Sequence, residues 1–160
     1  MGETLTYAYA DEGVDVRVAR IFNTYGPRMN EEDGRVVSNF IIQALKGQDI
    51  TIYGSGNQTR SFQYVHDLVD GLIQLMESEY TLPVNIGTPY EYTINDFARL
   101  ICSTVESKSQ ITYLPALQDD PKQRRPDIST AEKYLKWRPQ FSIDQGLEET
   151  IEYFKSRMIK

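Results

Sequence analysis

The segment GVDVRVARIFNTYGPRM, residues 13–29, carries the pattern that decides the fold. Three valines alternate with charged residues and lead into an apolar run, which predicts a buried β-strand over residues 14–22. Residues 4–12 before it have a helical pattern, and residues 23–34 after it contain Gly-Pro and Asp-Gly pairs typical of a loop. A helix that leads into a buried strand is the repeating step of an α/β sheet.

The rest of the chain also alternates between helical and strand patterns. Stop and cap signals bound the helices, among them Gly47 and capping boxes at residues 93–96 and 142–145. Further helices are predicted over residues 37–45, 65–76, 94–105 and 143–154, and short strands over residues 50–53, 84–87 and 111–114. The second of these helices is expected to bury Val65, Leu68, Val69, Leu72, Ile73 and Met76. Because these strands are too few to complete a doubly wound sheet, the fold is expected to be unfinished at its amino end.

Composition limits the class of protein. A net charge of −6 argues against a nonspecific nucleic-acid binder, because phosphate backbones require a basic surface. No apolar run approaches the roughly 20 residues that cross a bilayer. The first residues lack a secretory signal, and their match to a myristoylation pattern is weak. The chain as it stands is therefore expected to be cytoplasmic.

The single cysteine and the single histidine predict structural roles. Cys102 lies on the apolar face of a predicted helix and has no partner for a disulfide, which favours a core role in a reduced compartment. His66 lies at a helix entry without a nucleophile in its motif, so a structural or solvent-facing role is favoured over a general base. No metal site is expected from so few ligand residues. The turn at residues 54–57 is no dinucleotide loop, because position 59 is threonine rather than glycine.

Asn23 and Thr24 follow the predicted strand directly. Ligands of open α/β sheets bind at the carboxyl ends of the strands, which favours a binding role for this polar pair. Alternatively, Asn23 only satisfies backbone groups of the loop, as asparagine often does after a strand. The residues alone leave both interpretations open.

RIFNTYGPRM at residues 20–29, with DGRVVSNF at residues 33–40, closely resembles the UDP-glucuronate decarboxylases, or UDP-xylose synthases, of the extended short-chain dehydrogenase/reductase family. The resemblance resumes at YGSGNQTRSFQYV, residues 53–65. It returns from Asp119-Asp120-Pro121 through RRPDI, residues 124–128. It therefore extends over nearly the whole chain.

The resemblance implies an α/β fold made of an incomplete NAD-binding Rossmann-like sheet and a smaller domain that binds a nucleotide sugar. Residues 1–30 and about 62–87 would be the trailing elements of the Rossmann-like domain. Residues from about 31–61 and 88–160 would belong mainly to the substrate domain.

The resemblance also assigns roles to the first motif. Asn23 would hydrogen-bond the sugar or the diphosphate, and Thr24 would lie beside the nicotinamide of NAD. Arg35 would reach toward the cofactor, with a solvated charge beside Asp33 as the alternative. Asn30 stands where many relatives carry histidine, so the resemblance does not extend a cofactor contact to that position.

Three residues of the later motifs are implied to bind the UDP-sugar. Arg60 follows a glycine-rich turn and precedes an apolar helix, an arrangement that can aim a guanidinium at a diphosphate. Arg124 would hold the remaining phosphate charge, and Asp127 would accept a hydrogen bond from the uridine ribose. A surface salt bridge is the alternative for this pair.

The uracil would lie against Val36, Phe40 and the strand at residues 51–53. Phe40 and Ile52 are equally plausible as plain core residues, because apolar side chains on helices and strands usually are.

The family reaction requires groups that this sequence lacks. NAD oxidises the sugar at C4, the β-keto acid loses carbon dioxide, and the hydride returns to give UDP-xylose. A glycine-rich turn, a tyrosine base and a lysine four residues after it are needed. None of the 11 tyrosines has that lysine, and Tyr134 and Tyr153 have arginine there. In relatives the pair immediately precedes the segment that begins here at Gly2, so we expect no catalytic residue and no activity from this chain alone.

Other functions stay open at this point. A nucleotide-sugar 4,6-dehydratase or 4-epimerase shares the fold and the arginines, and a non-catalytic UDP-binding or assembly module is the alternative from another class. The resemblance implies a homodimer for the complete enzyme. It also allows a parent chain anchored in a membrane of a secretory compartment, although this segment predicts no membrane contact.

Overall fold

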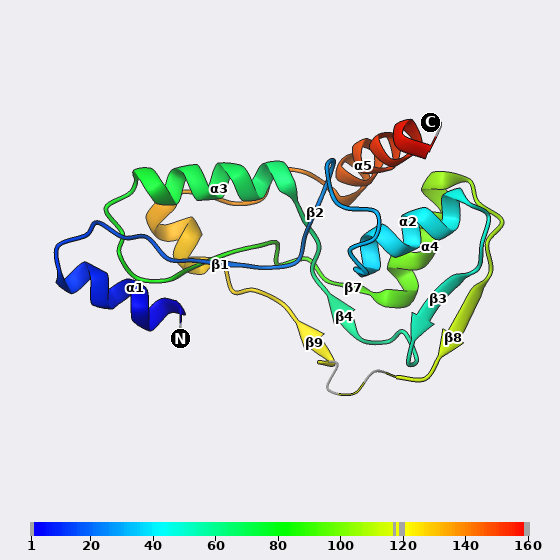
Figure 1. Ribbon diagram of the computed structural model, residues 1–160, viewed down its shortest axis with the longest axis horizontal. Coiled ribbons are helices and arrows are strands. Elements are labelled where there is room, and N and C mark those ends of the chain that lie inside the picture. Colours follow the sequence, from blue (N-terminus) through cyan, green and yellow to red (C-terminus); the bar gives the residue numbers. More distant parts are fainter. Residues whose placement is uncertain (1, 117, 119–120, 159–160) are drawn as a thin grey trace.

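The computed structural model of the chain describes residues 2–116, 118 and 121–158 and shows an α/β arrangement (Figure 1). The motif residues Asp119 and Asp120 lie outside the described residues. The helices are α1 (Gly2–Asp11), α2 (Val36–Leu45), α3 (Val65–Glu77), α4 (Ile94–Val105), the π-helical turn η1 (Ala131–Leu135) and α5 (Ile143–Met158). The strands are β1 (Ala19–Ile21), β2 (Thr24–Tyr25), β3 (Ile50–Tyr53), β4 (Thr59–Arg60), β5 (Gln63–Tyr64), β6 (Val84–Ile86), β7 (Tyr92–Thr93), β8 (Ile111–Leu114) and β9 (Gln123–Arg124).

The strand predicted over residues 14–22 is much shorter in the structure. Only Ala19–Ile21 pairs, in parallel, with β6, while Val14 is 52% exposed and Ile21 is 55% exposed. The prediction of a long buried strand was therefore wrong. The physical reason is that, in the part of the chain that the structure describes, β1 has a hydrogen-bonded neighbour on one edge only. Figure 1 shows α3 on one side of this pair of strands and α1 on the other.

The apolar stripe predicted on α3 is only half buried. Gly71 and Leu75 pack inward, toward a small core that contains Ile86 and Trp137. The predicted core residues Val69, Ile73 and Met76 are exposed instead. Successive helix residues turn by about 100°, so these three share a flank of α3 that points away from the buried Gly71 and Leu75. The apolar arc is wider than a sheet of two strands can cover.

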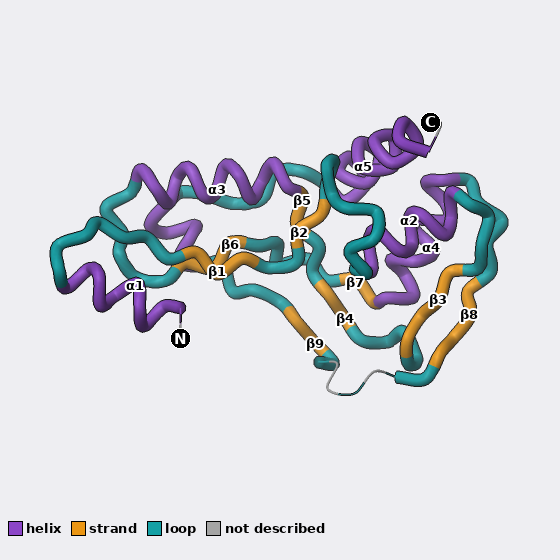
Figure 2. The backbone as a smooth tube through the Cα atoms, in the orientation of Figure 1, coloured by secondary structure: helices purple, strands orange, loops and turns teal. Residues whose placement is uncertain are grey.

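A larger core joins α2, α4 and α5 to the parallel pair β3–β8 and to residues of β2 and β5, at the other end of the molecule (Figure 2). Phe97 of α4, Ile41 of α2 and Phe154 of α5 are fully buried there. Both predicted capping boxes form. The Thr93 hydroxyl accepts from the Asp96 amide at 3.0 Å, and the Ser142 hydroxyl accepts from the Gln145 amide at 3.2 Å.

Within the described part of the chain, five two-residue strands lie between the two ends of the molecule, and the periodicity of the sequence did not predict them. One of them, β2, lies inside the predicted loop at residues 23–34 and pairs in parallel with β5. The others form a sheet in which β4 lies between β7, which is antiparallel to it, and β9, which is parallel to it. Strands of two residues are too short to show alternation.

Gly71 tests the packing of α3. A methyl group there would approach Ile86 Cγ2 to 2.9 Å and Trp137 Cε2 to 3.0 Å. We expect Gly71→Ala to lower the free energy of unfolding by about 1–3 kcal/mol through overpacking, although alanine is about 1 kcal/mol better than glycine inside a helix. Urea denaturation measures the change. Gly2→Ala is the control, because its methyl group would meet nothing within 4 Å. A Gly71→Ala chain as stable as the parent would contradict the packing described here.

Candidate nucleotide-sugar site

Two adjoining cavities lie at the carboxyl end of β1. They have volumes of about 300 and 440 Å³ and share Asn23, Thr24 and Arg35 in their walls. Met29, Gly34, Val36, Val37, Arg60 and Phe62 complete the smaller cavity, and Ile21, Phe22 and Arg124 complete the larger. Five of the six residues that the sequence assigned to substrate or cofactor therefore lie around one hollow.

Backbone pairing fixes the position of Asn23 and Thr24. The amide of Gln63 donates to the Asn23 carbonyl at 2.8 Å, and Thr24 is the register partner of Gln63 in the β2–β5 pair. The Thr24 hydroxyl donates to the Phe22 carbonyl at 2.9 Å. Among the described residues, the Asn23 side chain makes no hydrogen bond, and the contact that holds the loop comes from the Asn23 backbone carbonyl. This arrangement favours a binding role for the side-chain amide.

Gly26 explains the tight turn after this pair. Its φ is 155°, and a methyl group at this position would lie 2.4 Å from Cγ1 of Val65, the first residue of α3. Only glycine allows the chain to turn against α3 so closely. The close approach keeps the end of β2 against the start of α3.

Arg35 pairs with Asp33 and also borders both cavities. Its backbone amide donates to the Asp33 carboxylate at 3.0 Å, and its guanidinium lies 3.5 Å from the same carboxylate. Its side chain is 68% exposed, yet it borders both cavities. The arginine thus stands at the entry of α2 with its charge partly balanced and accessible to a ligand.

Arg60 and Arg124 are direct register partners in the parallel β4–β9 pair, so their side chains leave the sheet on the same face. Arg60 is buried and its guanidinium donates to the Thr59 carbonyl at 2.7 Å, whereas Arg124 is exposed. Among the described residues, no carboxylate lines either cavity. Three guanidinium groups around one hollow make it suited to an anion with several charges, such as a diphosphate.

Asp127 lies apart from these arginines. It lines a different cavity of about 380 Å³ together with Arg125 and Ser129. The Ser129 amide donates to its carboxylate at 2.9 Å, and this hydrogen bond holds the pKa of Asp127 below its usual range. The structure therefore does not bring Asp127 into the hollow that contains Arg60 and Arg124.

The residues considered for the uracil divide between wall and core. Val36 lines the smaller cavity, while Phe40 and Ile52 are buried in the larger core. Asn30 is exposed in the loop before α2, and its side chain accepts from the Glu32 amide at 3.1 Å.

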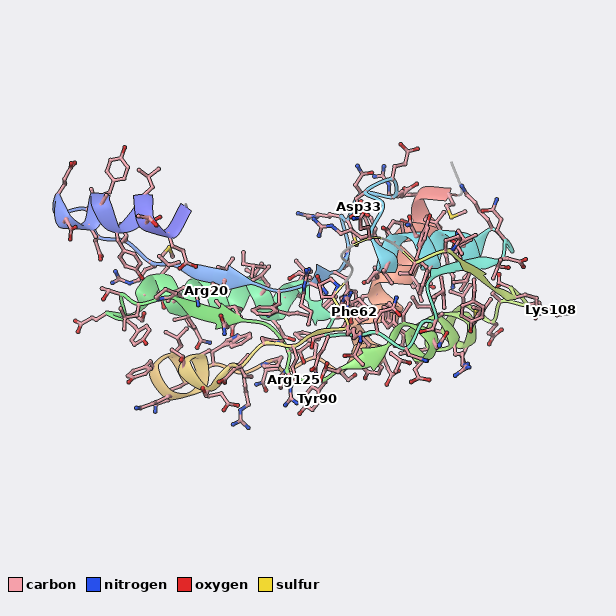
Figure 3. All side chains as sticks on the ribbon, turned by 90° about the horizontal axis from the view of Figure 1, so that it is seen from below. Arg20, Asp33, Phe62, Tyr90, Lys108 and Arg125 are labelled. Atoms are coloured by element: carbon pink, nitrogen blue, oxygen red, sulfur yellow. The ribbon has the colours of Figure 1, made fainter. Side chains whose placement is uncertain are left out.

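Sequence reasoning missed Phe62 as a wall of the site. Its ring is stacked on Phe97 at 4.0 Å between centroids, and it lies near the centre of the molecule in Figure 3. Phe62 belongs to the same motif as Arg60, and strand alternation would place the two on one face, which is the signal that could have identified it.

The remaining candidates have structural surroundings. His66 is exposed and packs edge-on against Tyr64 at 5.0 Å between ring centroids. Cys102 is half-buried beside the larger core, and burial raises the pKa of its thiol. Over residues 2–116, 118 and 121–158, no cluster of three or more potential metal ligands occurs. No helix among those residues has the length and apolar character needed to cross a bilayer.

Comparison with known proteins extends this description. Residues 1–87 match the NAD dependent epimerase/dehydratase family. UDP-glucuronic acid decarboxylase 1 of Danio rerio is 57% identical over 159 residues, which are 99% of this chain and 38% of the relative. UDP-glucuronic acid decarboxylase 3 of Arabidopsis thaliana is 48% identical, over 99% of this chain and 46% of the relative. The chain thus spans less than half the length of these relatives.

Solved structures agree with the fold. UDP-glucose 4-epimerase of Thermotoga maritima, determined with UDP-glucose, superposes with a TM-score of 0.92 at 29% identity, over 98% of this chain and 51% of the other. UDP-glucuronic acid 4-epimerase of Bacillus cereus, determined with UDP-glucuronic acid and NAD, gives 0.89 at 29% identity, over 98% of this chain and 50% of the other. The chain is therefore a homologue of the UDP-glucuronic acid decarboxylases and belongs to the NAD-dependent epimerase/dehydratase family.

Proposed function

We propose that this chain is the UDP-sugar-binding part of an NAD-dependent decarboxylase that converts UDP-glucuronate to UDP-xylose and carbon dioxide through a 4-keto intermediate. The observation that carries the proposal is the hollow at the end of β1, where Arg60 and Arg124 flank Asn23. Identity of 57% to a decarboxylase, against 29% to the epimerases, favours decarboxylation over epimerisation.

The two strand arginines bind the diphosphate in this proposal. Arg60 is buried and already oriented by its hydrogen bond to the Thr59 carbonyl, so little side-chain entropy is lost when it binds a phosphate oxygen. Arg124 approaches the same ligand from β9. Asn23 donates its side-chain amide to the sugar or to the diphosphate.

The uridine occupies the margin of the site. Val36 covers one face of the uracil, and the Asp127 carboxylate accepts a hydrogen bond from the ribose. Because its pKa is lowered, Asp127 stays ionised and remains an acceptor at neutral pH. Asp127 lies in a separate cavity, so a bound uridine would have to extend from one cavity to the other.

The chain offers contacts for only one end of NAD. Thr24 and Arg35 border the 440 Å³ cavity and would lie beside the cofactor, but no glycine-rich strand-to-helix turn for a pyrophosphate occurs in this sequence. NAD, when bound, accepts and returns the hydride of the sugar. The residues of this chain therefore fit only part of NAD, and the rest of the cofactor site is proposed to lie outside residues 1–160.

The tyrosine and lysine of the reaction are likewise proposed to lie outside this chain. Residues 1–30 and about 62–87 would then be the last elements of the cofactor domain, and most of the remainder the substrate domain. The segment that ends at Trp137 packs on α3 and β6, so it would accompany the cofactor domain. The free edge of β1 and the exposed flank of α3 would be covered by the missing elements, and the complete enzyme would be a homodimer.

The first test is activity. We expect this chain, purified and supplied with NAD and UDP-glucuronate, to form no UDP-xylose, because no tyrosine has a lysine four residues later. Product separation by chromatography measures the outcome, with the full-length Danio rerio relative as the positive control. Formation of UDP-xylose by this chain would require another proton acceptor and would overturn the catalytic part of the proposal.

The second test is binding. We expect UDP to bind to the chain in isothermal titration calorimetry, and Arg124→Ala or Arg60→Lys to weaken it about 10- to 100-fold, since each removes charged hydrogen bonds worth about 1.5–3 kcal/mol. Arg99→Ala is the matched control, because Arg99 is exposed and pairs with Asp96 on α4, away from both cavities. Absence of UDP binding by the parent chain would remove the proposed binding function.

A further inference from the structure

Glu91 lies in the turn before β7, outside both cavities, yet its carboxylate joins the two strands that carry the arginines. We infer that Glu91 is a positioning residue that clamps β9 to β4 and thereby holds Arg124 beside Arg60. This inference rests on the proposed function, because it concerns the geometry of the diphosphate site, and it adds a residue that no motif had indicated.

The contacts of Glu91 are short and come from both strands. The Thr59 hydroxyl of β4 donates to Glu91 Oε1 at 2.6 Å. The Gln123 side chain of β9 donates from Nε2 to Oε1 at 3.0 Å and to Oε2 at 2.9 Å. Arg125 lies 4.0 Å away from Oε2, and the Glu91 side chain is 18% exposed. One carboxylate therefore connects a hydroxyl and an amide on neighbouring strands.

Strand geometry transmits this clamp to the arginines. Thr59 and Gln123 are register partners, and the next pair in the ladder is Arg60 with Arg124. Successive side chains of a strand point to opposite faces, so the pair bound by Glu91 and the arginine pair lie on opposite faces of the same two strands. Fixing the first pair fixes the distance and register of the second.

The clamp supports a strand pairing that is short. The β9 strand has two residues. One further backbone hydrogen bond, from the Thr59 amide to the Lys122 carbonyl at 3.0 Å, adds to its pairing with β4. Without the carboxylate, Arg124 is expected to move away from Arg60 until a ligand brings them together. Binding would then have to order β9, and the entropic cost of that ordering would reduce the affinity for the ligand.

The charge of Glu91 is maintained by its partners. The hydrogen bond from Thr59 lowers the pKa of Glu91 against the opposite effect of desolvation, and the bond from Gln123 and the attraction of Arg125 act in the same direction as Thr59. A group with a lowered folded-state pKa contributes stability that is lost as the pH falls through that pKa. The clamp is therefore intact at neutral pH.

A double-mutant cycle tests the inference. Glu91→Ala is expected to weaken UDP binding about tenfold, measured by calorimetry, and to have less than about a twofold effect in an Arg124→Ala background, since a positioning residue acts through the residue that it positions. Glu91→Gln, which keeps the shape, should have a smaller effect in the same direction. Glu152→Gln is the control, because Glu152 is 70% exposed and pairs with Lys155 on α5. An equal loss in both backgrounds, or no loss in the parent, would refute the clamp.

Hydrogen exchange tests the same inference without a ligand. The Thr59 amide, bonded to the Lys122 carbonyl, should exchange faster in Glu91→Ala and Glu91→Gln than in the parent, with unchanged exchange in Glu152→Gln. Unchanged Thr59 exchange in a folded Glu91 variant would overturn the clamp even if UDP binds. Conversely, if the parent chain binds no UDP but the Thr59 amide exchanges faster in the Glu91 variants than in the parent, the clamp is supported and only the proposed function is removed.

Discussion

The parallel pairing of β2 with β5 is the constraint on which the rest of the structure depends. It joins the chain segment that leaves β1 to the segment that carries Arg60, although the two are almost 40 positions apart in sequence. Tyr25 and Tyr64 are register partners and are both buried, with ring centroids 5.7 Å apart. The Tyr25 hydroxyl donates to the Ile143 carbonyl at 3.3 Å, which ties the first turn of α5 to the same pair. Two hydrogen-bonded residues per strand thus hold both ends of the molecule together.

This pairing also explains how much the sequence could predict. Helices with caps and wide apolar faces, such as α4 with Thr93 and α5 with Ser142, carry their own signals and were predicted correctly. The two-residue strands carry no such signal, because their stability comes from partners distant in the chain. The extent of β1 and the buried face of α3 were predicted wrongly for a related reason. Both predictions assumed a sheet wider than the two strands present, and apolar periodicity shows which side chains seek burial, not whether a neighbour covers them.

The residues of the candidate site likewise include some that the sequence could predict and others that it could not. Asn23, Thr24 and Arg35 lie in two neighbouring motif stretches, residues 20–29 and 33–40, and could be assigned from them. The structure brings them together with Arg60 and Arg124. The sequence gives no sign that Arg60 and Arg124 are cross-strand partners, because 63 residues separate them and each lies in a strand too short to recognise. The same is true of Glu91, whose partners come from two other strands. The spacing of residues along the chain does not show which residues of two distant strands are paired.

The two arginines of this site, Arg60 and Arg124, lie on strands whose backbones are hydrogen-bonded to each other. Arg60 is buried beside Phe62, whose ring is stacked on Phe97 in the larger core, so the residues that hold a ligand share their support with the packing that stabilises the domain. Arg124, in contrast, lies among the described residues on the edge strand β9, whose Gln123 side chain hydrogen-bonds to Glu91. The two arginines therefore differ in what fixes them. A perturbation of the core should affect Arg60 and folding together, whereas a perturbation of the turn before β7 should affect Arg124 while the core stays intact, and this difference makes the two contributions to binding experimentally separable.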